Sequence, residues 1–279
     1  MNRIIEYVVA LGDLFMPRAC LACGRRLGMR ERHLCLSCAA DVPYTRFWLA
    51  PHNPLADRFN AVLERHRGTE PMDYAYAAAL LYYKGAYRSI PRALKYQGDL
   101  AAGRHYGALL GRRLAAAPHF RDVDLIIPVP LHWTRRRSRG YNQAEILARA
   151  IADAYAPGAA CRPELLVRSR RTRTQTRLSV EQKARNVASA FQVPGHFPFS
   201  FRLRKALFPK LSQRSMPIKP APESPRTVLA SARHILLVDD TFTTGATLYA
   251  CYAALRPHTS ARISVATLAA VEGTPSGVP

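Results

Sequence analysis

HILLVDDTFTTGATL, residues 234–248, joins a run of aliphatic residues to two adjacent aspartates and a loop of threonines and one glycine. The aliphatic run predicts a strand over 235–239 that is buried on both faces, as in a parallel sheet. Asp239 and Asp240 would then emerge at its carboxyl end, where open α/β sheets bind ligands. Burial and mutual repulsion disfavour two adjacent carboxylates, so we expect a cationic or hydroxyl-rich partner beside them.

The loop after the aspartates predicts an anion cradle. A helix is expected over 246–256, and the backbone N–H groups that precede it would point at an anion. Gly245 would allow close backbone approach, and the neighbouring threonine hydroxyls would add donors. Two carboxylates beside such a cradle suit a ribose phosphate, whose hydroxyls donate to carboxylate oxygens. We expect the surrounding positive charge to help keep both carboxylates ionised.

The remaining elements predict a layered α/β domain with a parallel sheet. Asn142, followed by Glu145 three residues later, predicts a capping box at the start of a helix. The other expected elements are a strand at about 74–83, a turn at Lys84 and Gly85, a helix around 87–96, a second helix over AGRHYGALLGRRLAAA, a short strand within 122–133, a basic loop TRRRSRGY at 134–141, and a strand over 262–268.

Four of the six cysteines follow the pattern C-x2-C, eleven residues, C-x2-C. In a reducing compartment this spacing predicts a structural zinc site rather than a pair of disulfides, with the ligands Cys20, Cys23, Cys35 and Cys38. We expect the other two cysteines to be buried apolar residues. The predicted organisation is an N-terminal helix and a double zinc ribbon-like unit with four cysteines over 1–45, a linker over 46–72, and an α/β domain over 73–279.

The chain carries a net charge of +22 over 279 residues, which favours phosphate-bearing partners, either nucleic acid or phosphorylated metabolites. A basic, proline-rich insertion is expected at about 195–231. The apolar N-terminus is interrupted by Glu6 and Asp13, which argues against a signal peptide. No apolar run is long enough to span a membrane, so we expect no membrane insertion and a cytoplasmic protein.

LLVDDTFTTGAT resembles the phosphoribosyl pyrophosphate (PRPP) binding motif of type I phosphoribosyltransferases. The resemblance implies that fold, with a parallel sheet flanked by helices. It also implies that Asp239 and Asp240 meet the ribose hydroxyls and act in catalysis, with magnesium bound alongside PRPP. The positions implied for the 5′-phosphate and its surroundings are Thr241, Thr243, Thr244, Gly245, Ala246 and Thr247.

Over most of its length the chain resembles the ComF family of competence-associated, phosphoribosyltransferase-like proteins. The pieces that carry this resemblance are FMPRACLACG with LCLSCAADVP, YYKGAYRSIPRALKYQGDL, IIPVPLHWTRRRSRGYNQAEILARAIA, LLVRSRRTRTQTRLSVEQKARNVASAF and the final motif. The family implies a role in DNA uptake. It also implies that the loop after the IIPVP strand lines the pyrophosphate side, with the residues Arg135, Arg139, Asn142 and Gln143. For each single arginine there, a solvated surface position is an equal alternative.

The segment RRTRTQTRLSVEQKARN, residues 170–186, would be the flexible loop over a bound substrate. Its side chains could close over pyrophosphate or follow the backbone of single-stranded DNA. The residues proposed for the second role are Arg170, Arg171, Arg173, Gln175 and Arg177.

Three functions therefore stay open from the sequence. The first is an enzyme that transfers a ribosyl phosphate from PRPP to an acceptor. The second is a non-catalytic protein that binds single-stranded DNA through the basic segment 170–186. The third is an adaptor whose zinc unit docks on a competence helicase.

Overall fold

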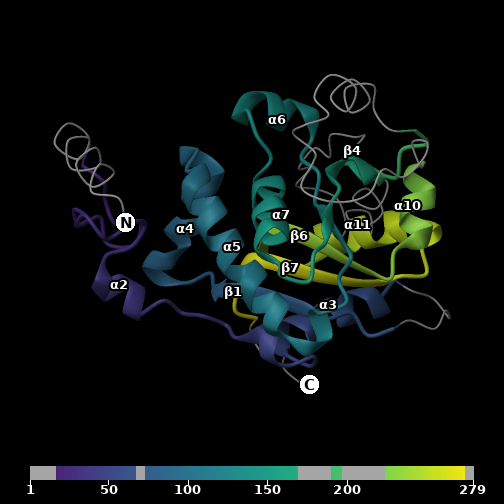
Figure 1. The fold of residues 1–279 in the computed structure, drawn as a ribbon, viewed down its shortest axis with the longest axis horizontal. Helices are drawn as coiled ribbons and strands as arrows, with labels where there is room; N and C mark the ends of the chain where they lie inside the picture. Colours follow the sequence, from purple (N-terminus) through teal and green to yellow (C-terminus); the bar gives the residue numbers. More distant parts are fainter. Residues whose placement is uncertain (1–16, 67–72, 169–189, 197–223, 274–279) are drawn as a thin grey trace, which may run out of the picture.

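The computed structural model describes residues 17–66, 73–168, 190–196 and 224–273 (Figure 1). Its centre is a five-stranded sheet in the order β1-β7-β6-β2-β3, in which every pairing is parallel. The strands are β1 (Ala77–Tyr82), β2 (Leu125–Pro128), β3 (Ala160–Cys161), β6 (His234–Phe242) and β7 (Arg262–Ala270). Helices cover both faces, which confirms the predicted α/β class and the parallel sheet.

β6 is the middle strand of this sheet, between β7 and β2. Ile235 and Leu237 enter the core on one face, and Leu236 and Val238 enter the core on the other, all nearly without exposure. This is the burial expected of an aliphatic run in a parallel sheet covered on both sides. The strand is longer than the predicted 235–239, because its ladder with β7 continues to Phe242.

One face of the sheet is covered by α5 (Leu100–Ala116) and α7 (Gln143–Ala154). The two helices pack closely along three glycines of α5, spaced four residues apart: Gly103, Gly107 and Gly111. A Cβ at Gly111 would lie 2.6 Å from the Ile151 carbonyl oxygen. The glycines therefore let the α5 backbone approach α7 more closely than any larger residue would allow.

The other face is covered by α11 (Ala246–Leu255) and α3 (Pro54–Glu64). The sequence predicted a linker over 46–72, and α3 corrects that prediction within this range. Asn53 caps α3 and Pro54 occupies its first turn, so this Asn-Pro pair begins a helix. Asn60 anchors α3 to the chain before β1, because its amide donates to the Ala75 carbonyl and accepts from the Ala75 N–H.

Most of the predicted insertion at about 195–231 lies outside the described residues. Its last part is helical rather than irregular. It forms α10 (Pro225–Ser231), which is capped by Ser224. Val228 and Leu229 of α10 are buried in the core beside β6. None of the described helices has the length and apolar content needed to cross a membrane.

The chain between β1 and β2 also contains helical turns η2 (Gly85–Arg88), α4 (Ser89–Arg92), η3 (Ala93–Gln97) and η4 (Pro118–Phe120). These agree with the helix predicted around 87–96. The segment predicted as a basic loop at 134–141 is instead largely helical, as α6 (Trp133–Arg139), with the His132 imidazole as its N-cap acceptor. The remaining short elements are η1 (Phe47–Leu49), η5 (Pro163–Leu165), η7 (Arg256–His258), β4 (Val167–Arg168) and β5 (Phe191–Gln192).

The direction in which successive strands are added to the sheet reverses between β6 and β2. From β6 the chain passes through α11 to β7 on one side, and from β2 it passes through α7 to β3 on the other. These two helices lie on opposite faces (Figure 1). In open α/β sheets such a switch point opens a crevice at the carboxyl ends of the two strands, where ligands bind.

The packing of α5 on α7 generates the first prediction. Gly111→Ala should lower the free energy of unfolding by about 1–2 kcal/mol, because overpacking against the α7 backbone outweighs the higher helix propensity of alanine. Urea unfolding followed by circular dichroism measures the change. Gly195→Ala is the control, since no atom of the described residues lies within 4 Å of its added Cβ. An unchanged or raised stability in Gly111→Ala would contradict the close packing.

Candidate functional site

Asp239 and Asp240 lie at the switch point, near the carboxyl end of β6. β2 stops at Pro128, which pairs with Val238, so beyond this register β6 is paired only with β7 among the described residues. Asp240 is only 8% exposed, and its backbone N–H donates to the Asp239 carboxylate at 2.8 Å. The structure thus brings the two predicted carboxylates together at the edge where a ligand can reach them.

Lys95 compensates part of this negative charge, and no sequence motif indicated this role. Its ammonium lies 3.5 Å from the Asp240 carboxylate. Lys95 belongs to η3, a single π-helical turn of the kind often found at functional sites. The turn is held by the segment before α7, because the Tyr141 hydroxyl donates to the Leu94 carbonyl at 2.5 Å. The Arg139 guanidinium also lies over the Tyr96 ring, 5.5 Å from its centroid.

The pKa of Asp239 is raised, which corrects the expectation that positive charge keeps both carboxylates ionised. Burial is the largest cause, and the adjacent charge of Asp240 raises the pKa further. Lys95 and Arg168 act in the opposite direction without overcoming these effects. The pair is therefore held at an energetic cost, which a ligand that donates hydrogen bonds or positive charge would relieve.

The threonine-glycine loop joins β6 to α11 beside the carboxylates. Gly245 is the N-cap of α11 and has a left-handed backbone conformation, with φ of +79°. Glycine is favoured at this position because other residues rarely adopt this conformation. Thr243, Thr244 and Ala246 are exposed and Thr247 is half-buried. The loop presents these groups to solvent at the N-terminus of a ten-residue helix, as an anion cradle requires. Thr241 lies just before the loop, in β6, and pairs with Ala269.

Arg58 of α3 supports the loop from behind, and sequence reasoning missed it. Its guanidinium donates to the Thr243 carbonyl at 2.7 Å and to the Val271 carbonyl at 2.6 Å. It also lies over the Phe242 ring, 5.2 Å from the centroid. The helix within the predicted linker thereby fixes the position of the candidate phosphate loop.

Of the predicted residues after β2, Asn142 and Gln143 lie at the start of α7. Asn142 is the N-cap of α7, as expected, and its amide donates to the Val129 carbonyl at 3.0 Å. Glu145 does not complete the reciprocal capping box and instead pairs with Arg149, at 2.8 Å, and with Arg136, at 3.6 Å. Gln143 is 3% exposed, and among the described residues its amide nitrogen has no hydrogen-bond partner. A buried donor of this kind calls for an acceptor.

The predicted arginines of this segment lie on or beside α6. Arg135 is exposed, and it is close enough to Arg168 to lower the pKa of that guanidinium, after burial as the main cause. Arg139 packs on Tyr96 and is half-buried. The five residues proposed for binding single-stranded DNA, from Arg170 to Arg177, lie outside the described residues.

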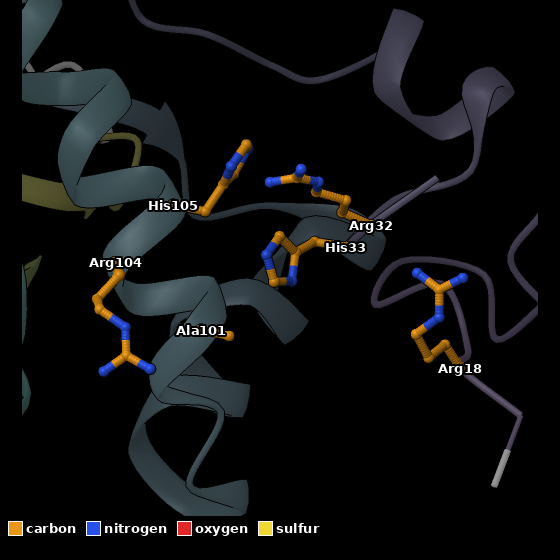
Figure 2. A pocket seen from close by; sticks show the side chains of 6 residues that line it. All are labelled: Arg18, Arg32, His33, Ala101, Arg104 and His105. Atoms are coloured by element: carbon orange, nitrogen blue, oxygen red, sulfur yellow. The ribbon is translucent and has the colours of Figure 1, made fainter. Parts of the chain in front are cut away.

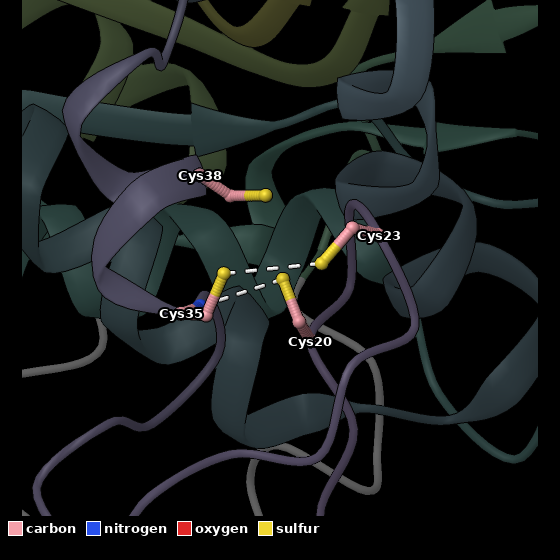
Figure 3. A group of neighbouring side chains, drawn as sticks. All are labelled: Cys20, Cys23, Cys35 and Cys38. Carbon is pink, nitrogen blue, oxygen red and sulfur yellow. Dashed lines mark hydrogen bonds between the residues drawn. The ribbon is translucent and has the colours of Figure 1, made fainter.

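The four predicted zinc ligands form one cluster (Figure 3). Their Sγ atoms all lie within 4.8 Å of one another, and those of Cys23 and Cys35 are 3.8 Å apart. Tetrahedral Zn–S bonds of about 2.3 Å place sulfur atoms roughly 3.8 Å apart, so the spacing fits zinc. Four thiolates leave no open position, as in structural sites. The second C-x2-C turn leads into α2 (Leu36–Ala40).

The thiols of the cluster differ in acidity. Burial opposes ionisation of Cys20, but backbone N–H donors from Cys23, Cys35 and Ala22 outweigh it and lower its pKa to about 6. A hydrogen bond from the Cys38 backbone likewise lowers the pKa of Cys35. These donors stabilise thiolates, which are the form that binds a metal ion.

The segment that carries the cluster, residues 17–45 of the described chain, is called the zinc unit below, and it packs on the α/β domain. The Tyr87 hydroxyl donates to the Cys38 carbonyl at 2.8 Å, and Leu21 and Leu34 pack against the core cluster that includes α5. Of the two remaining cysteines, Cys251 is fully buried and Cys161 is half-buried, close to the expectation.

A serine, a histidine and an aspartate also meet at the opposite, amino end of β6. The His234 imidazole contacts Asp122 at 2.7 Å through Nδ1 and Ser264 at 2.8 Å through Nε2. This order of contacts is that of a hydrolytic triad. The Ser264 and His234 side chains have no exposed surface, however, so no substrate can reach them. The group is a hydrogen-bond network in which the buried His234 of β6 links Ser264 of β7 to the more exposed Asp122, which precedes β2.

Comparisons with known proteins do not assign the chain. No family model matches it, and no curated protein is similar to it. The candidate site therefore rests on the sequence motifs and the geometry described above.

The raised pKa of Asp239 generates a stability prediction. A carboxyl group that holds its proton more tightly when folded destabilises the protein as pH rises above its ordinary pKa. Asp239→Asn should therefore raise the free energy of unfolding at pH 8, and the gain should shrink as pH falls toward 4. Asparagine keeps the oxygen that accepts from the Asp240 N–H. Urea unfolding across this pH range measures the effect.

Asp153→Asn, an exposed substitution on α7, is the control for the loss of one carboxylate. It should leave stability almost unchanged over the same pH range. If Asp239→Asn lowered the free energy of unfolding equally at pH 8 and at pH 4, the result would contradict the raised pKa of Asp239.

The cysteine cluster generates a metal prediction. The purified protein should contain one zinc ion per chain, measured by plasma emission spectroscopy, and Cys20→Ser/Cys35→Ser should contain almost none. Chelation should lower the thermal unfolding midpoint, because metal binding stabilises the folded unit. Cys251→Ser is the control for zinc content. Full zinc content in the double variant would contradict the assignment.

Proposed function

We propose that the chain is a phosphoribosyltransferase-like protein of the ComF type that binds PRPP at the carboxyl edge of β6. The observation that carries this proposal is the placement of two adjacent carboxylates beside an exposed threonine-glycine loop at the topological switch point. Carboxylates suit ribose hydroxyls, and the loop with the α11 N-terminus suits a 5′-phosphate.

Each part of the ligand has a proposed partner. Asp239 and Asp240 accept from the ribose hydroxyls, which offsets the burial and the repulsion that raise the Asp239 pKa. The backbone N–H groups and hydroxyls from Thr243 to Thr247 hold the 5′-phosphate. Lys95, already 3.5 Å from Asp240, is placed to donate to ribose or pyrophosphate oxygens.

The residues beyond β2 would form the pyrophosphate side of the site. The buried amide of Gln143 supplies a donor without a partner among the described residues. Arg135 supplies positive charge from α6. Arg139 fixes Tyr96 and, through the η3 turn, helps position Lys95.

Magnesium fits the donor set, because carboxylate oxygens are the ligands that it prefers. Bound by Asp239 and Asp240 together with the diphosphate, it would stabilise the charge that develops as pyrophosphate leaves. The proposed activity is transfer of the ribosyl phosphate to an acceptor. The role in DNA uptake follows from the ComF resemblance.

Calorimetry with PRPP and magnesium tests the proposal. The wild-type protein should bind PRPP, and Asp239→Asn/Asp240→Asn should weaken binding at least about tenfold, since each lost charge-assisted hydrogen bond contributes roughly 1.5–3 kcal/mol. Lys95→Met should weaken it as well.

Asp153→Asn is the matched control, and its affinity should equal that of the wild type. Pyrophosphate release measured with a panel of bases and amines then separates an enzyme from a binding protein. No PRPP binding by the zinc-loaded wild type, or equal binding by the double aspartate variant, would refute the proposed site.

A further inference from the structure

A second pocket lies between the zinc unit and α5, and it shares no residue with the carboxyl edge of β6. It has a volume of about 580 Å³ and is open to solvent (Figure 2). Its lining consists of three arginines, two histidines and one alanine: Arg18, Arg32, His33, Ala101, Arg104 and His105. Among the described residues, no acidic side chain belongs to this lining, whose charged groups are all basic.

The arginines of the lining come from two separate parts of the fold. Figure 2 shows His33 in the centre, Arg104 of α5 on one side and Arg18 of the zinc unit on the other. The Arg18 guanidinium is held in place, because it donates to the Glu31 carbonyl at 2.8 Å and to the Gly28 carbonyl at 3.3 Å. These two hydrogen bonds fix the position of the guanidinium at the edge of the pocket.

The other two arginines are not neutralised by neighbours within the part of the chain that the structure describes. Arg32 and Arg104 are exposed, and no carboxylate there lies within ion-pair distance of either. The nearby carboxylate of Asp99 lies 4.0 Å from the His33 imidazole instead. Arg32 and Arg104 thus place two uncompensated positive charges at one pocket, which favours the binding of an anion.

The two imidazoles of the lining pack against each other and against the Tyr106 ring. The rings of His33 and His105 lie 5.0 Å apart, and the Tyr106 ring is 5.0 Å from His105 and 6.0 Å from His33. Tyr106 is buried in the core that α5 shares with the sheet. Each imidazole can add one N–H donor to those of the guanidinium groups.

The zinc unit sets the position of its half of the pocket. Arg18 and His33 each lie two residues before a cysteine of the cluster, Cys20 and Cys35. The Arg18 carbonyl accepts from the Leu27 N–H, and the His33 carbonyl accepts from the Leu21 N–H. The cysteine turns thus hold both residues against α5.

We propose that this pocket is a second ligand site that binds phosphate groups. Guanidinium forks match phosphate oxygens in geometry and charge, and three of them with two imidazoles can surround a diphosphate or successive phosphates of a nucleic-acid backbone. The zinc unit therefore has a role beyond structure, because it supplies the half of an anion site that faces α5. The second site is independent of PRPP binding at β6.

Zinc-loaded full-length protein is titrated with two probes: inorganic pyrophosphate, followed by calorimetry, and a fluorescein-labelled oligothymidylate of about 12 nucleotides, followed by anisotropy. The test variant is Arg32→Ala/Arg104→Ala. The control is Arg121→Ala/Arg226→Ala, which removes the same charge from exposed positions outside the pocket and outside the proposed PRPP site. Thermal unfolding checks that both variants are folded.

At least one probe should bind the test variant about tenfold or more weakly than the control, because two charge-assisted contacts are lost. A loss for pyrophosphate alone identifies a small diphosphate ligand, and a loss for the oligothymidylate alone identifies a nucleic-acid backbone. In the second case the slope of log affinity against log salt should also become shallower by about 1.4. Equal affinities of test and control variants for both probes would overturn the proposal.

PRPP binding measured on the same test variant keeps the two sites apart. It should match that of the wild type, because neither arginine touches the carboxyl edge of β6. A folded test variant that loses PRPP binding together with the probes would overturn the claim of a second site.

Discussion

The central constraint in this protein is the burial of β6 as the middle strand of a parallel sheet. A strand covered on both faces and paired on both sides has little room for charge, yet its last residues include two adjacent carboxylates. They are tolerated because β2 ends one residue earlier in register, which opens one side of β6 at that point. The same opening leaves them accessible at the edge of the sheet, so the stability cost and the proposed binding site have one structural origin.

Elements that are distant in the sequence assemble the edge of the sheet around the carboxylates. α3 supplies Arg58, which holds the carbonyl of the loop that follows β6. The η3 turn supplies Lys95 beside Asp240. The segment before α7 ties that turn in place through Tyr141. The edge of the sheet is therefore assembled from three parts of the chain around the carboxylate pair.

Much of this could be predicted from local sequence, because the signals are local. The aliphatic run before Asp239 predicted the buried strand, Asn142 predicted the start of α7, and the C-x2-C pairs predicted the cysteine cluster. In each case the residues that form the pattern also make the contacts. Asn53 and Pro54 carried a helix-start signal too, but it was interpreted as a loop because Asn and Pro also favour turns.

The rest depends on contacts between distant residues. Nothing near Lys95 in the sequence shows that its ammonium lies beside Asp240, and nothing near Arg58 shows that it reaches Thr243. The ionisation of Asp239 was predicted from net charge, whereas local burial decides it. The basic segment after β2 was expected to be irregular, but His132 caps a helical turn there. Net charge and composition describe averages, and these features are set by single neighbours.

A crystal structure of the zinc-loaded protein with PRPP and magnesium tests the central claim most directly. We predict density for the 5′-phosphate at the backbone N–H groups of Thr243 to Thr247. We also predict ribose hydroxyls within hydrogen-bond distance of Asp239 and Asp240. PRPP bound elsewhere, with Asp240 still paired only to Lys95, would contradict the assignment of the carboxyl edge of β6 as the ribose-phosphate site.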